Sequence, residues 1–90
     1  MPISPESRPL VARAVRRRAI AESRVSIEPG EIADDELLNG PLLKVNSLGF
    51  VGMLIHLEDE LGITLADDLF VGRTFRTVAD LIDAVAEGAR

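Results

Sequence analysis

The chain has 90 residues, a formal net charge of −5 and no cysteine. This length allows one domain with a modest core, and the lack of thiols excludes disulfides, thiolate metal sites and a cysteine nucleophile. No segment is long and apolar enough to span a membrane, and the first residues do not open a secretory signal, so we expect a cytoplasmic protein without membrane contacts. Six of the ten basic residues precede residue 25, and the acidic remainder should repel nucleic acid.

The first helix is expected over about residues 8–22. Ser7 is a plausible cap, and Pro9 fits the first turn, where its missing N–H has no partner to lose. Val11, Val15 and Ala19 form an apolar stripe at helical spacing. We expect a flexible segment at residues 1–7 and a single domain over 8–90.

A long connection follows, from about residue 23 to residue 45. Pro29-Gly30 and Asn39-Gly40-Pro41 interrupt it with turn signals. Its apolar side chains are too many for a free linker, so we expect them to pack across the helices: Ile27, Ile32, Leu37, Leu38, Leu42 and Leu43.

The second helix should have Ser47 in its first turn, with Asn46 or Ser47 as its cap, and should end at Gly62. Four apolar residues recur at helical spacing and predict its core face: Phe50, Leu54, Leu57 and Leu61. A helical wheel places three others to one side, where we expect partial exposure rather than plain core packing: Leu48, Val51 and Ile55.

A short third helix is expected over residues 67–71, and a last one begins near Thr77. Residues 77–80 (Thr-Val-Ala-Asp) resemble a capping box. Since no stretch shows the alternation of a strand, the sequence predicts an all-α, four-helix bundle with a long first loop.

Ser47 is the candidate functional residue. At the first turn of a helix, backbone N–H groups and the helix dipole both stabilise an anion, so a phosphate group attached to the Ser47 hydroxyl would be favoured. Without further signals, Ser47 would be an ordinary serine at a helix start.

Other polar residues carry weaker signals. The acids at 58–60 fit either a solvated helix face or a surface for partners. His56, the only histidine, has no apparent triad and should be a surface residue. Two adjacent carboxylates before a short helix are more often a cap than a cation site, so we expect a cap at Asp67-Asp68 and no metal. Residues 16–18, three arginines, should be a solvated face; pairing with acids of the long loop is an alternative, and nucleic-acid binding is the weaker one.

Four segments in order resemble the acyl carrier protein family. Residues 27–32 (Ile-Glu-Pro-Gly-Glu-Ile) resemble the segment after its first helix, and 46–48 (Asn-Ser-Leu) stand where it has Asp-Ser-Leu. Residues 57–63 match its Leu-Glu-acidic-Glu-apolar-x-Ile run, and 77–81 match the opening of its last helix. The series in this order is far more specific than the three-residue motif alone.

The resemblance implies a four-helix bundle whose Ser47 carries 4′-phosphopantetheine, taken from coenzyme A by a phosphopantetheinyl transferase. It implies a carrier rather than an enzyme, which holds acyl or aminoacyl groups as thioesters for acyl-loading and acyl-processing enzymes. The resemblance also implies the residues that face these partners: Asn46, Leu48, Val51, Ile55 and Glu58. We expect a stand-alone monomer.

Two departures from the family pattern bear on function. Asn46 replaces the Asp that helps the transferase and its metal ion to engage the carrier. Gly49 and Gly52 replace acids that dock on basic partner residues, which predicts an electrostatically bare helix start that permits close approach of another backbone. This favours a dedicated pathway such as polyketide or other specialised biosynthesis. The alternative is an unmodified adaptor that binds proteins through its Leu48 side.

Overall fold

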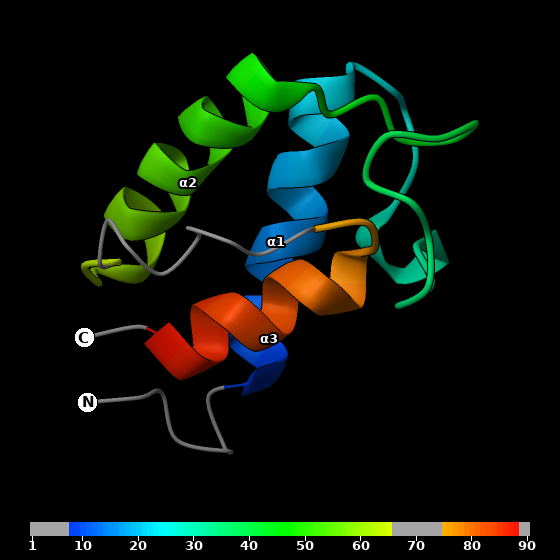
Figure 1. Ribbon diagram of the computed structural model, residues 1–90. Coiled ribbons are helices and arrows are strands. Elements are labelled where there is room, and N and C mark those ends of the chain that lie inside the picture. The colour runs from blue at the N-terminus through cyan, green and yellow to red at the C-terminus, as the bar shows by residue number, and fades with distance from the viewer. Residues whose placement is uncertain (1–7, 66–74, 89–90) are drawn as a thin grey trace.

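The computed structural model describes residues 8–65 and 75–88, and these residues are helical with long connections (Figure 1). Helix α1 spans Arg8–Ser23, the short 3₁₀ helix η2 spans Pro29–Glu31, α2 spans Ser47–Leu61 and α3 spans Val78–Gly88. Within these ranges there are isolated bridges but no strand. The all-α prediction is confirmed, with three α-helices found; the short helix expected at 67–71 and the flexible segment expected at 1–7 lie outside the described residues.

Helix α1 packs against both α2 and α3, so it forms the centre of the bundle (Figure 1). Its predicted stripe is confirmed, because Val11, Val15 and Ala19 are buried. The three helices, the long loop and the chain after α2 contribute to one core: Val11, Ala14, Val15, Ala19, Ile20, Ile32, Leu38, Leu43, Val45, Met53, Leu57, Leu65, Val78, Leu81, Ile82 and Val85.

Four of the five arginines of α1 bind acids on three other segments. Arg16 pairs with Asp34 of the loop and donates to the carbonyl oxygen of Ile32 at 2.9 Å. Arg17 and Arg18 both pair with Glu60 of α2. Arg8 pairs with Asp83 of α3. The alternative of pairing with loop acids is therefore found for Arg16, and all three arginines of the run at 16–18 have partners within the chain.

The long loop between α1 and α2 is packed, as its apolar content predicts. Leu38 and Leu43 are buried, and the Leu38 N–H donates to the carbonyl of Arg76 at 2.9 Å. Leu37 differs from the prediction, because 37 % of its surface is exposed. Its backbone bridges Thr77, and neighbouring side chains of an extended segment point to opposite faces, so burial of Leu38 turns Leu37 outward.

Both ends of α2 lie where the sequence places them. Asn46 caps the start: its Oδ1 accepts the N–H of Gly49 at 2.7 Å. Gly62 ends the helix with a left-handed φ of 65°, which a glycine adopts without steric cost. Among the described residues, no helix is long and apolar enough to cross a membrane.

Helix α3 begins with the predicted capping box. The Asp80 N–H donates to Thr77 Oγ1 at 3.2 Å, and Asp80 Oδ2 accepts the N–H of Thr77 at 3.1 Å. The loop completes this helix start, since the N–H groups of Val78 and Ala79 donate to the carbonyls of Glu36 and Asp34. The start of α3 is thereby fixed against the long loop.

Candidate functional site

Ser47 is the first residue of α2 and is exposed to solvent. Asn46 before it has extended backbone angles, which turn the chain from the loop into the helix. The Asn46 side chain is occupied by its bond to Gly49, so the Ser47 hydroxyl is not needed as the cap. A hydroxyl in this position is accessible to a modifying enzyme, and the adjoining N–H groups favour an anion attached to it.

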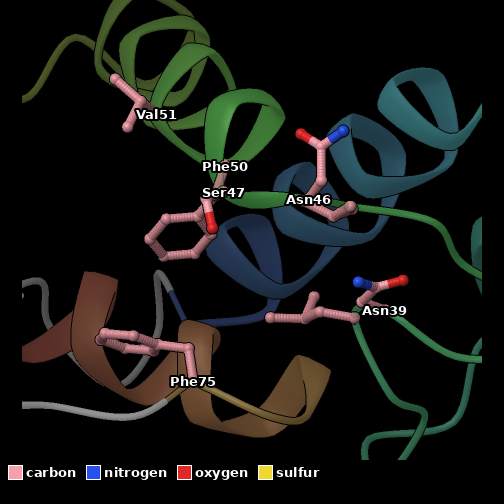
Figure 2. Close-up of a pocket in the computed structure, with 8 residues that line it drawn as sticks. Asn39, Asn46, Ser47, Phe50, Val51 and Phe75 are labelled. Atoms are coloured by element: carbon pink, nitrogen blue, oxygen red, sulfur yellow. The ribbon is translucent and has the colours of Figure 1, made fainter.

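A pocket of about 560 Å³ adjoins Ser47. Figure 2 shows that its walls come from three segments: Ser47, Phe50 and Val51 from α2, Phe75 from the chain before α3, and Asn39 from the loop. The rings of Phe50 and Phe75 lie 5.4 Å apart between centroids and are tilted by 35°. Five of the eight lining residues are apolar, and the amides of Asn39 and Asn46 add hydrogen-bonding groups.

The side of α2 next to Ser47 is apolar and exposed. Leu48 has 84 % of its surface exposed, Val51 has 56 % and Ile55 has 60 %. The predicted exposure of these three residues, which we call the Leu48 face, is confirmed. On the opposite side Leu57 is buried and Phe50, Leu54 and Leu61 are half-buried, as expected of the core stripe.

Sequence reasoning missed Met53, which is only 1 % exposed and is among the largest fully buried side chains. The signal was present, since Met53 stands three residues after Phe50 and four before Leu57 and so shares their face of the helix. The apolar stripe of α2 is therefore wider than the four predicted residues indicate.

Two of the acids on α2 are engaged within the chain. Glu58 Oε2 accepts the N–H of Leu65 at 2.8 Å and so holds the chain that follows the helix. Burial raises the pKa of Glu60, but hydrogen bonds from Arg18 and Arg17, with their charges, outweigh it and leave the pKa below its ordinary value. Glu60 therefore stays ionised and joins α2 to α1. The partner role of Glu58 stays a prediction.

His56 is exposed on α2. Within residues 8–65 and 75–88, no three side chains of the histidine, cysteine or acidic types come together as metal ligands. The expected cap at Asp67-Asp68 lies outside the described residues.

Ser47 is thus an exposed serine at the capped start of a helix in a small helical domain. The family model described as "Phosphopantetheine attachment site" matches residues 18–85. The chain belongs to this family of carrier domains, whose cofactor is covalently attached 4′-phosphopantetheine. Neither the curated proteins nor the solved structures gave a match.

Proposed function

We propose that this chain is an acyl carrier whose attachment residue is Ser47. The observation that carries the proposal is the placement of Ser47: inside the matched region, exposed, and first in a helix that Asn46 caps. Ser4, Ser7, Ser23 and Ser26 lack the residues of the family pattern that follow Ser47. Of these, Ser23 is also occupied, because its Oγ accepts the N–H of Lys44 at 2.7 Å.

In the proposed modification, Ser47 Oγ attacks the phosphorus that joins pantetheine to the rest of coenzyme A. A phosphodiester forms at Oγ, the bond to 3′,5′-ADP breaks, and a base of the transferase takes the hydroxyl proton. The terminal thiol of the attached arm supplies the thioester chemistry that a chain without cysteine lacks. The apolar side chains of Phe50, Val51 and Phe75 line the pocket beside the hydroxyl and offer the arm a wall.

The chain itself is proposed to have no catalytic activity. Its partners would be a phosphopantetheinyl transferase and the enzymes that load and process acyl groups. The Leu48 face and Asn46 would contact these enzymes. An exposed apolar face of this kind favours enzymes of a dedicated pathway, such as polyketide or related specialised biosynthesis, over partners selected by acidic patches alone. We propose a cytoplasmic monomer.

Intact mass spectrometry tests the attachment. After incubation with coenzyme A and a broad-specificity transferase, the protein should gain one phosphopantetheine, and Ser47→Ala should abolish the gain. The variant should keep its helical circular dichroism signal, because Asn46 still caps α2. Ser23→Ala is the matched control and should be modified normally. A gain of mass by the Ser47→Ala variant would place the arm elsewhere.

The exposed Leu48 face supports a second candidate, an unmodified adaptor that binds proteins through this surface. The same measurement separates the two functions. A protein that gains no mass with several transferases, and that is purified from its own cell without the arm, would be an adaptor rather than a carrier.

A further inference from the structure

The side chain of Glu22, in the last turn of α1, lies across the first turns of α2. A Cβ added to Gly49 would stand 3.0 Å from Cγ, 3.1 Å from Cδ and 3.2 Å from Oε2 of Glu22. At Gly52 the added Cβ would lie 4.0 Å from Oε1 of the same carboxylate. Gly49 therefore provides the space that Glu22 occupies, and Gly52 lies beside it at ordinary contact distance; we call the two glycines the glycine notch. The end of α1 and the start of α2 lie side by side (Figure 1).

This arrangement corrects one sequence prediction. The start of α2 is not electrostatically bare, because α1 delivers a carboxylate to it. The close approach that the glycines permit is made by a side chain and not by another backbone.

The other acids on α2 do not provide a free charge near Ser47. Glu58 and Glu60 are bonded within the chain. Asp59 stands ten residues beyond Gly49, or about 15 Å along the helix axis. Glu22 is exposed, and within the described residues no hydrogen bond or ion pair engages its carboxylate. Among the described residues, Glu22 is therefore an unpaired acid of α1 that lies beside the Ser47 end of α2.

We propose that Glu22, seated in the glycine notch, is a docking residue for the phosphopantetheinyl transferase and pairs with a basic side chain of that enzyme. This inference rests on the proposed function. Gly49 is two residues from Ser47, about 3 Å along the helix axis, so the Glu22 charge lies within one Debye length of the hydroxyl at moderate salt.

A charge in this position acts mainly on the encounter of two proteins. Exposed charges at the rim of an interface raise the association rate and make it sensitive to salt, while the apolar Leu48 face is largely indifferent to salt. Removal of one such charge should lower kcat/KM by about two- to fivefold at low ionic strength. The difference should vanish as salt screens the pair.

The experiment measures kcat/KM for attachment of phosphopantetheine to the intact chain across a salt series. Glu22→Gln should lower it by about two- to fivefold at low salt and flatten its salt dependence, without slowing the reaction at high salt. Glu31→Gln is the matched control: this acid is exposed on η2, which packs on α1 alone, and its loss should change the rate far less. Circular dichroism and urea unfolding of each variant separate docking from stability.

Gly49→Ala tests the notch. The added Cβ meets a flexible side chain, and alanine favours a helix, so the variant should fold while it displaces Glu22. It should lower the low-salt rate as well, and should have no further effect in the Glu22→Gln background, since both changes act on one carboxylate.

Equal rates for wild type and Glu22→Gln at low salt would overturn the inference while leaving the carrier function intact. Additive effects of the two substitutions would overturn the role of the notch. A wild-type chain that accepts no phosphopantetheine would overturn the proposed function itself, and this inference with it.

Discussion

Helices α2 and α3 begin in different ways, although the first N–H groups of both helices need acceptors from outside the helix. At α3, Thr77 and Asp80 bond each other's N–H groups, and loop carbonyls accept from Val78 and Ala79. At α2, the Asn46 side chain accepts one N–H, that of Gly49. In the described part of the chain, no acceptor is found for the N–H groups of Ser47 and Leu48.

The difference separates a structural helix start from a functional one. In the first turn of α3, the N–H groups of Val78 and Ala79 donate to loop carbonyls and so hold the helix against the loop. The first turn of α2 leaves N–H donors, the Ser47 hydroxyl and the Leu48 side chain directed at solvent. This is unfavourable for stability but leaves the start of the helix open to a phosphate and to partner proteins.

The largest effect on stability is expected at the start of α3. Asp80→Ala removes the acceptor of the Arg76 and Thr77 N–H groups, so the free energy of unfolding should fall by about 1–2 kcal/mol. Urea unfolding monitored by circular dichroism measures it. Asp83→Ala, on the same helix, loses only an exposed ion pair with Arg8 and should cost less than about 1 kcal/mol. Equal losses in both variants would mean that the box contributes little.

The cap of α2 should contribute somewhat less. Asn46→Ala should lower the free energy of unfolding by about 1 kcal/mol, whereas Asn46→Asp should change it by less than about 1 kcal/mol because both residues cap well. Asn46→Asp should also speed the modification of Ser47 if the missing carboxylate weakens transferase recognition. An unchanged or slower rate would show a transferase adapted to Asn.

Low pH should weaken both the start of α3 and the contact between α1 and α2. Hydrogen bonds from the N–H groups of Arg76 and Thr77 hold the pKa of Asp80 below its ordinary value of 3.8. The pKa of Glu60 also lies below its ordinary value of 4.5. Since the unfolded chain binds these protons more tightly, the stability that the two acids contribute is complete above their ordinary pKa values. It is lost as pH falls through the lower folded values.

Unfolding experiments from pH 6 to pH 3 should therefore show stability falling below about pH 4.5. Asp80→Ala should lose less stability over this range than the wild type. A parallel pH profile would show that Asp80 does not contribute.

The smallest effect on stability is expected at the Leu48 face. Val51→Ala and Ile55→Ala remove exposed side chains, so the free energy of unfolding should change by less than about 0.5 kcal/mol. Transfer of the acyl group to the partner enzyme should fall more in these variants than in Asp59→Asn, an exposed acid on the same helix. A steep salt dependence of transfer, with the acid dominant, would contradict an apolar docking mode.

The sequence was sufficient where the signal is local. The caps at Asn46 and Thr77 and the stop at Gly62 depend on side chains within a few residues, and each appears as expected. The stripe of Val11, Val15 and Ala19 and the exposure of the Leu48 face follow from helical periodicity.

The sequence was not sufficient where the partner lies far along the chain. The carboxylates of Glu58 and Glu60 look alike in sequence, yet one holds the Leu65 N–H and the other pairs with α1. The place of Glu22 over Gly49 depends on how α1 packs on α2, which periodicity does not determine. The family pattern supplied Ser47 as the attachment residue, because a serine at a helix start alone has no such meaning.

The hydrogen bonds between the long loop and the start of α3 have a consequence for the way this protein opens. The Leu38 N–H is bonded to Arg76, and the N–H groups of Val78 and Ala79 are bonded to Glu36 and Asp34, across about forty residues of chain. None of these amides can exchange its hydrogen with water unless the loop and α3 separate. We expect them to exchange together, as one cooperative unit, while the amides at the start of α2 exchange far sooner. The attachment end could then loosen repeatedly without unfolding the rest.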